Sequence, residues 1–332
     1  MFTLLSSITI TNLIYLILGK LLLKKNINNL KVYSEISLYG FIYFSFFALI
    51  INFFTALNPI INTLVIFVII LTYIFKKKRF VKKELVFLIL TIFFCFFVIL
   101  FDTVYRPDAG LYHLPFIKIL NEEKIIFGLS NLHARFGHIS IIQYSSALNN
   151  NLLVGDTGIL LPLLSIYCFL TFYFIGDVLN LFLKKNNINY NFVSVFFSSM
   201  VLLYVSYKIN RYSEFGNDAI GHMLYFYLIS KLINYKEINY LNFNNIYLIA
   251  VFTILNKFTL IFSLLIPVYL FFKNRISLKR SLISLPTVLL FVWILRNLIT
   301  SGCALYPQLN TCFVDLKWSN KEQVIVESES AE

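Results

Sequence analysis

The stretch VILFDTVYRPDAGLYHLPFIKIL, residues 98–120, marks an abrupt change in the chemistry of the chain. An apolar run that begins at about residue 85 ends here, and it is long enough to cross roughly 30 Å of hydrocarbon. Four ionisable side chains then follow within a dozen positions, namely Asp102, Arg106, Asp108 and His113. The stretch therefore predicts that the chain leaves a membrane and at once enters a polar segment carrying acid, base and imidazole groups.

The composition extends this pattern to the whole chain. Of its 332 residues, 59% are hydrophobic and only 13% are charged, and the mean hydropathy is +0.78. Soluble domains carry about 25% charged residues, so we expect an all-α protein, a polytopic bundle of transmembrane helices that forms one integral membrane domain over residues 1–332. The net charge of +12 does not indicate nucleic-acid binding, because no basic stripe lies on a soluble domain.

Apolar segments long enough for membrane spans recur along the sequence. The first is expected to be a retained span rather than a signal peptide, because no basic region precedes it and its apolar stretch is too long. The predicted spans cover residues 2–23, 36–57, 60–75, 85–101, 158–183, 191–208, 219–235 and 281–298, with a broken pair over 245–272.

Basic clusters set the predicted orientation, since Lys and Arg concentrate in short cytoplasmic loops. The clusters are Lys24 with Lys25, residues 76–83, Lys184 with Lys185, and residues 273–280. This arrangement places both termini, the loop over 102–157 and the tail over 299–332 on the extracytoplasmic side of a bacterial inner membrane. All four histidines and most of the sixteen acidic residues then lie at or near the outer face. Acidic residues contribute little to orientation, so their clustering is an independent indication that any chemistry belongs to that face.

The segment over 245–272 is too long for one crossing and too short for two full ones, and Lys257 lies in its middle. We expect two short helices broken near Asn256 and Lys257. Irregular backbone at membrane depth is tolerated where it lines a cavity or is buried in protein, and an intramembrane lysine marks a functional site by default. The alternative is that Lys257 reaches out to the membrane surface, and the sequence does not choose between the two.

The outer loop is expected to hold amphipathic helices that lie on the membrane surface, in the stretches GLYHLPFIKIL and HARFGHISIIQYSSAL. These helices would keep Asp102 and Asp108 at the boundary between water and lipid. A carboxylate there can act as a general base toward a hydroxyl, and two carboxylates beside a phosphate can share Mg²⁺ or Mn²⁺. The alternative for each aspartate is a helix cap or a solvated side chain.

Several further side chains are candidates for substrate binding at the same face. Arginine suits bidentate contact with phosphate, imidazole can donate a hydrogen bond, and Asp218 is either a site residue or the N-cap of the following span. The spacing of the histidines matches no zinc pattern. The candidates are His113, His133, Arg135, Arg211, Asp218, Lys257 and Arg296.

The four cysteines fall into two groups. Cys95 and Cys168 lie inside predicted spans and are expected to pack as small apolar residues. Cys303 and Cys312 flank ALYPQLNT in the outer tail, where a pair of thiols can close a disulfide in an oxidising compartment. Two unpaired thiols in a reducing host are the alternative.

Three motifs carry a resemblance to a known group: Asp-x-x-x-Tyr-His-Leu at 108–114, Gly-Leu-x-Asn-Leu-His-x-Arg at 128–135, and RNLITSGCALYP at 296–307. Over about residues 80–320 the chain resembles uncharacterised bacterial polytopic membrane proteins that are themselves similar to glycosyltransferases of the GT-C class, which use lipid-linked sugars. In GT-C enzymes an acidic residue in the first large outer loop supports base catalysis or metal binding. Here that implicates Asp102 or Asp108.

Two departures from the GT-C pattern accompany this resemblance. The acid-bearing loop follows a fourth predicted span, whereas GT-C enzymes place it after the first. Members of the uncharacterised group continue into further spans beyond the point where this chain ends, so the resemblance also predicts a truncated member.

Three functions follow as hypotheses. The first is a GT-C-like glycosyltransferase that uses a polyprenyl-phosphate sugar, together with membrane lipids and a divalent cation, at the outer face. The second is a transporter or flippase of a lipid-linked or anionic solute, which the broken segment favours because discontinuous helices build sites near the membrane midplane. The third is a non-catalytic scaffold in the assembly of envelope polysaccharide.

Overall fold

The protein is all-helical. The computed structural model describes residues 2–23, 29–77, 79–100, 108–138, 140–183, 192–207, 217–235, 239–313 and 315–330. Within these ranges 82% of the chain is helical and there is no strand, apart from an isolated bridge between Cys303 and Cys312. This confirms the predicted all-α class.

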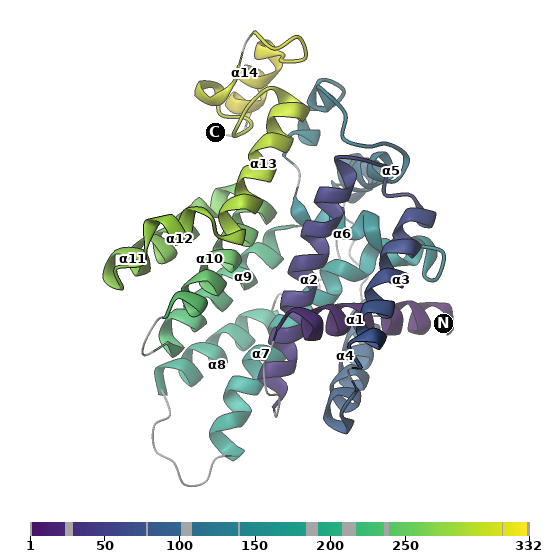
Figure 1. Ribbon diagram of the computed structural model, residues 1–332, viewed down its shortest axis with the longest axis vertical. Coiled ribbons are helices and arrows are strands. Elements are labelled where there is room, and N and C mark those ends of the chain that lie inside the picture. The colour runs from purple at the N-terminus through teal and green to yellow at the C-terminus, as the bar shows by residue number, and fades with distance from the viewer. Residues whose placement is uncertain are drawn as a thin grey trace.

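The apolar segments of the sequence form the helices of the bundle (Figure 1). These are α1 (Phe2–Leu22), α2 (Leu30–Asn52), α3 (Pro59–Phe75), α4 (Lys82–Leu100), α7 (Leu161–Leu183), α8 (Phe192–Tyr207), α9 (Asn217–Asn234), α10 (Tyr240–Asn256), α11 (Leu265–Lys273) and α13 (Leu285–Ser301). A short basic helix, α12 (Leu278–Leu282), lies between the last two. Four helical stretches among the described residues are long and apolar enough to cross a membrane: Phe2–Leu22, Leu30–Asn52, Lys82–Leu100 and Gly155–Asn180.

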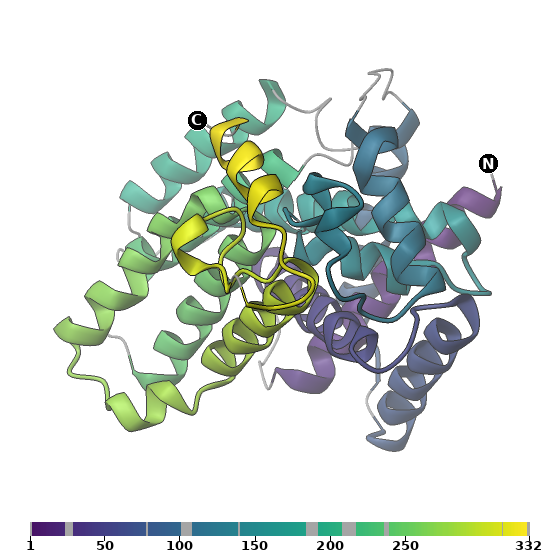
Figure 2. The same ribbon diagram turned by 90° about the horizontal axis from the view of Figure 1, so that it is seen from above.

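The segments predicted as outer loop and tail are built from short helices. The loop contains η1 (Ala109–His113, a π-helical turn), α5 (Leu114–Glu122), η2 (Leu129–Asn131), η3 (Ala134–Phe136), α6 (Ile141–Asn149) and η4 (Gly155–Leu160), and the tail contains η7 (Leu309–Thr311) and α14 (Lys321–Ser330). In Figure 1, α14 and α5 lie toward one end of the long axis, and Figure 2 shows α14 beside the loop segments. The tail and the α5 part of the loop therefore lie toward the same end of the molecule.

Helix α2 differs from the predicted span over 36–57. It begins six residues earlier, because Lys31 and Glu35, which lower the hydropathy of this stretch, are paired with charged partners inside the protein. It ends at Asn52, and the apolar residues that follow turn to pack on α5, where the Leu57 N–H donates to the Leu120 carbonyl at 2.8 Å. A hydropathy profile therefore predicts neither the earlier start of α2 nor the turn that follows Asn52.

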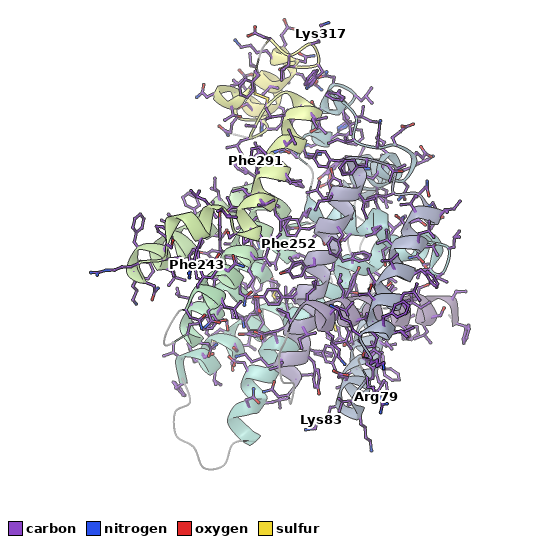
Figure 3. All side chains as sticks on the ribbon, in the orientation of Figure 1. Arg79, Lys83, Phe243, Phe252, Phe291 and Lys317 are labelled. Atoms are coloured by element: carbon purple, nitrogen blue, oxygen red, sulfur yellow. A yellow bond between two sulfur atoms is a disulfide. The ribbon has the colours of Figure 1, made fainter. Side chains whose placement is uncertain are left out.

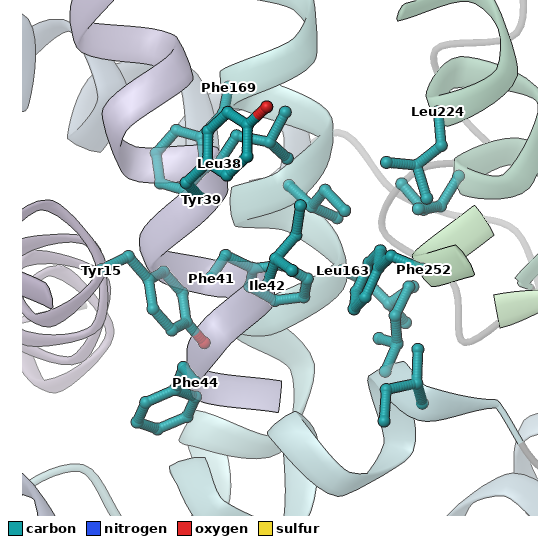
Figure 4. Close-up of a cluster of buried hydrophobic side chains, with 14 of the residues drawn as sticks. Tyr15, Leu38, Tyr39, Phe41, Ile42, Phe44, Leu163, Phe169, Leu224 and Phe252 are labelled. Carbon is teal, nitrogen blue, oxygen red and sulfur yellow. The ribbon is translucent and has the colours of Figure 1, made fainter. Parts of the chain in front are cut away.

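Helices α1 and α2 cross at two glycines. A Cβ atom added to Gly19 would lie 1.9 Å from the Ile36 carbonyl oxygen, and one added to Gly40 would lie 1.9 Å from that of Tyr15. Only hydrogen at these positions allows the two backbones to approach so closely. Next to the crossing, the Tyr15 ring makes an edge-to-face contact with Phe41 at 5.2 Å, within the apolar core that Figure 4 shows between α1, α2 and α7.

Three ion pairs, two of them buried and one partly buried, join the helices at one end of the bundle. Lys20 in α1 contacts Glu84 in α4 at 2.7 Å, Lys31 in α2 pairs with Asp177 in α7, and Lys231 in α9 pairs with Glu35 in α2. Figure 3 places the nearby Arg79 and Lys83 at the lower end of the molecule and Lys317 of the tail at the opposite end. Labelled basic residues therefore lie toward both ends of the long axis.

The outer-loop helix α6 corrects one expectation. Its sequence alternates apolar and polar faces, which predicted a helix lying on the membrane surface, but all nine residues Ile141–Asn149 are buried. The polar face is satisfied by protein rather than by water: the Asn149 side chain donates to Thr11 at 3.0 Å and to the Gly158 carbonyl at 2.8 Å. An amphipathic pattern cannot distinguish these two surroundings.

Candidate functional site

The break in the segment over 245–272 creates the first part of the site. Helix α10 ends at Asn256, Lys257 has extended backbone angles (φ −147°, ψ 112°), and the chain continues as η6 (Phe258–Leu264) and then α11. Gly221 in α9 lets the break pack closely, since a Cβ atom there would lie 2.8 Å from a Leu260 methyl group. The extended backbone at Lys257 interrupts the helix beside the first turns of α9.

Lys257 reaches Asp218 across this contact. Its Nζ lies 2.6 Å from Oδ1 of Asp218, in the first turn of α9, and the two side chains are 29% and 63% exposed. Lys257 is therefore held by a carboxylate and still accessible. One turn further along α9, the ring nitrogen Nδ1 of His222 lies 3.4 Å from the hydroxyl of Tyr204.

Asp108 and Tyr112 form the second part. Asp108 occupies the residue before η1, yet its side chain makes no capping hydrogen bond and it is exposed. Burial raises the pKa of the Tyr112 phenol to about 12, and the negative charge of Asp108 and a hydrogen bond from the phenol to this carboxylate act in the same direction. The charges of Arg135 and Asp218 also act on Tyr112, so the loop and α9 meet here.

His113 lies beneath these groups. It is 5% exposed, and its Nδ1 lies 2.6 Å from Nε2 of Gln143 in α6. Burial lowers the pKa of His113 to about 4, although the carboxylates of Asp108 and Asp218 both act to raise it. Both aspartates are thus within electrostatic range of one imidazole, which brings three predicted site residues into one neighbourhood.

Arg135 connects the site to the tail. Its guanidinium lies 6.0 Å from the centre of the Tyr112 ring, and its Nε is 3.7 Å from Glu327 of α14. Glu327 also contacts Nε2 of His138 at 3.0 Å. Burial lowers the pKa of His138, which the Glu327 charge opposes and the Arg135 charge reinforces. Arg135 therefore belongs both to the site and to the contact that holds α14.

Of the other predicted binding residues, Arg296 is enclosed by protein, and His133 is exposed and caps a short helix. Arg296 is 0% exposed, and it donates from Nε to the Tyr144 hydroxyl at 3.1 Å and from Nη1 to Oδ1 of Asn297 at 2.7 Å. A ligand phosphate cannot reach a guanidinium so enclosed. His133 accepts the Arg135 N–H at Nδ1 (3.2 Å) and thereby caps η3. Asp102 and Arg211 lie outside the described residues.

The tail is closed on itself by a disulfide, and hydrogen bonds hold it on α13 and on the outer loop, where the Gln323 amide donates to the Ser130 carbonyl at 2.8 Å. Cys303 and Cys312 are bonded to each other, whereas Cys95 and Cys168 are free and buried. The indole N–H of Trp318 donates to the Leu298 carbonyl at 2.9 Å, which orders the chain between the disulfide and α14.

The sequence matches one described family, a domain of unknown function named DUF8201, over residues 1–332. The chain belongs to this family. No curated protein and no solved structure matches it significantly. The family description names no activity.

The described residues contain no cluster of protein side chains typical of a metal centre. Among the residues that the structure describes, no three His, Cys, Asp or Glu side chains gather closely enough to hold a metal ion. The hypothesis of Mg²⁺ or Mn²⁺ between Asp102 and Asp108 therefore depends on Asp102. The described part of the site instead pairs carboxylates with cations, a phenol and an imidazole.

Three residues near the site were absent from the sequence prediction. Tyr112 follows Asp108 by four residues, a spacing that places both side chains on one face of a helical turn. Gln143 follows Ser140 by three residues, the signature of a capping box. Both signals were readable in the sequence, whereas nothing local to Glu327 indicates that α14 packs against Arg135.

Proposed function

We propose that the chain is a GT-C-like glycosyltransferase of the bacterial inner membrane, and that it transfers a sugar from a polyprenyl phosphate to a hydroxyl at the extracytoplasmic face. The observation that carries this proposal is the convergence of Asp108, Asp218 and Lys257 beside a break in an apolar helical segment. An exposed carboxylate, a cation and an apolar surface are the three elements that such a reaction requires.

The surroundings of Lys257 suit an amphipathic phosphate. The residues that follow the break expose apolar side chains, among them Phe262 (69%) and Leu265 (62%). A prenyl chain can lie along these residues while its phosphate contacts Lys257, whose ammonium group then exchanges Asp218 for the ligand. Arg135, which is half-exposed, offers a second cation from the loop side.

Asp108 is the proposed general base. The acceptor oxygen attacks the anomeric carbon, the bond from that carbon to the phosphate oxygen breaks, and polyprenyl phosphate leaves with the bonding electron pair. The hydroxyl proton passes to Asp108. Phosphate is a good leaving group, so the step needs no general acid, and single displacement inverts the anomeric configuration.

The sidedness of the site supports the proposed location. The clustered basic residues Arg79 and Lys83 lie at the end of the molecule opposite the tail, and positive residues favour the cytoplasm (Figure 3). On this orientation the tail lies outside the cytoplasm, and the proposal retains the extracytoplasmic placement predicted for the loop and for both termini.

The test uses the purified chain in lipid nanodiscs with a panel of polyprenyl-phosphate sugars that differ in the sugar. Mass spectrometry follows the appearance of polyprenyl phosphate. We expect turnover of at least one donor, lost by about a hundredfold or more in Asp108→Asn, because removal of a general base costs about 10²- to 10⁴-fold. Glu122→Gln is the matched control: this loop carboxylate is exposed and contacts only Lys118 at 3.8 Å among the described ion pairs, so its loss should leave turnover unchanged.

Full activity of Asp108→Asn would show that Asp108 is not the general base. If the wild-type chain turned over none of the donors, the proposal of glycosyltransferase activity would be wrong. The second candidate, a flippase for a lipid-linked anion, is favoured by the helix break at Lys257. Movement of a polyprenyl-phosphate sugar across proteoliposomes without release of polyprenyl phosphate would establish that function in place of transfer.

A further inference from the structure

A row of buried hydrogen bonds runs from the outer loop to the helix break. Nε2 of Gln143 lies 2.6 Å from Nδ1 of His113, Oε1 of Gln143 accepts the Ser140 N–H at 3.0 Å, and the Ser140 hydroxyl donates to Oδ1 of Asn256 at 2.9 Å. All four residues are buried, and Asn256 directly precedes Lys257. These contacts connect η1, α6 and α10 beneath the proposed site.

The capping box of α6 sets the orientation of the Gln143 amide. A backbone N–H can only donate, so the atom of Gln143 that faces Ser140 is the carbonyl oxygen. The amide nitrogen must then face His113. An amide nitrogen also only donates, so Nδ1 of His113 is the acceptor and carries no proton. Helix capping, a local feature, thereby determines the tautomer of a distant imidazole.

The surroundings keep this imidazole neutral. The charged groups that act on it are Asp108, on its own turn, and Asp218, from α9, while α6 contributes the uncharged Gln143. Burial outweighs both carboxylates and holds the pKa of His113 near 4. At neutral pH the ring therefore has one proton, on Nε2, and can act as a donor but not as a competing cation.

We propose that Gln143 is a positioning residue that locks His113 as a neutral Nε2–H donor to one oxygen of a phosphate ester bound between Lys257 and Arg135. The chemical class of the ligand rests on the proposed function, whereas the tautomer lock does not. A neutral donor adds direction to phosphate recognition without placing a third positive charge beside Lys257 and Arg135. Because this imidazole donates rather than accepts, Asp108 remains the group that takes the proton from the hydroxyl that receives the sugar.

The decisive variant is Gln143→Glu. A glutamate at the third helical position completes a capping box as well as glutamine does, so α6 keeps its N-terminus. Its carboxylate cannot donate, however, so His113 must present a proton on Nδ1, either as the other neutral tautomer or as imidazolium. The matched control is Gln308→Glu, the same chemical change at an exposed residue of the tail.

Two measurements test the proposal. The first is nitrogen-15 NMR of labelled histidine in nanodiscs, with the His113 signals assigned from their loss in His113→Asn. We expect an unprotonated Nδ1 and a protonated Nε2 in the wild-type chain and in Gln308→Glu, and a protonated Nδ1 in Gln143→Glu. The second is the binding of farnesyl phosphate. Removal of the imidazole in His113→Phe deletes the Nε2–H donor and should weaken this binding about ten- to a hundredfold, with Gln308→Glu unchanged.

A wild-type spectrum with a protonated Nδ1 overturns the proposal even if the variant fails to fold. An unchanged affinity of His113→Phe for farnesyl phosphate overturns the donor role. Inorganic phosphate distinguishes the source of the anion, because a lipid site binds farnesyl phosphate more tightly than free phosphate. If the NMR and binding results are both as expected while no sugar donor is turned over, the phosphate site with its oriented His113 is supported. In that case only the proposal of glycosyltransferase activity is wrong.

Discussion

The ion pair between Lys20 and Glu84 makes a sharp test of how charge is buried in this bundle. The ammonium and carboxylate are 2.7 Å apart, and their side chains are 7% and 1% exposed. In Glu84→Gln the amide oxygen can still accept the Val81 N–H, which lies 2.9 Å from the carboxylate, so the start of α4 keeps this hydrogen bond. The substitution therefore removes mainly the negative charge.

The size of the effect follows from what Lys20 retains. Breaking a buried pair costs about 3–5 kcal/mol, because one charge is left uncompensated. Lys20 keeps hydrogen bonds to the Tyr73 hydroxyl and the Arg79 carbonyl, and its ammonium group lies 4.9 Å from the centre of the Phe80 ring. These contacts place Glu84→Gln at the lower end of that range, a loss of about 3 kcal/mol in the free energy of unfolding.

The assay is a reversible titration of the detergent-solubilised chain with sodium dodecyl sulfate, followed by circular dichroism. The double variant Lys20→Met with Glu84→Gln removes both charges and should recover stability to within about 1 kcal/mol of the wild type. Glu122→Gln is the exposed control, with an expected loss below about 1 kcal/mol. A loss below about 1 kcal/mol for Glu84→Gln, or a double variant as unstable as the single one, would refute the reasoning.

Three further predictions concern packing, orientation and pH. Gly40→Ala should separate α1 from α2, because its Cβ would meet the Tyr15 carbonyl at 1.9 Å; a melting temperature equal to that of the wild type would contradict this crossing. In intact cells a membrane-impermeant maleimide should label Lys317→Cys and spare Lys83→Cys, and the reverse pattern would invert the proposed orientation. The pKa of His113 is about 4 in the folded chain and 6.5 as its ordinary value, so the unfolded chain binds more protons between these values. Stability should be complete above pH 6.5 and fall by about 3 kcal/mol as the pH drops to 4, with a smaller fall in His113→Asn.

The nature of the protein was readable from the sequence because it depends on local composition. Apolar runs of helix length predict an all-helical chain with helices able to cross a membrane, and four described helices have that length and composition. The disulfide of the tail could also be predicted from the sequence, because Cys303 and Cys312 are only nine residues apart. Among the predicted site residues, Asp108 and His113 share one helical turn, so their proximity required no knowledge of the fold.

Other features depended on contacts between distant segments. Whether Arg296 binds a ligand or is enclosed is decided by Tyr144, 152 residues away, and whether Lys257 reaches the surface is decided by Asp218 on another helix. The buried pair of Lys20 and Glu84 likewise joins two helices. Charge, burial and hydrogen bonding are properties of an environment, and only the tertiary structure supplies the environment. The sequence by itself therefore determined which groups the protein has for chemistry, and the packing of α6, α9 and α10 decided which of them meet.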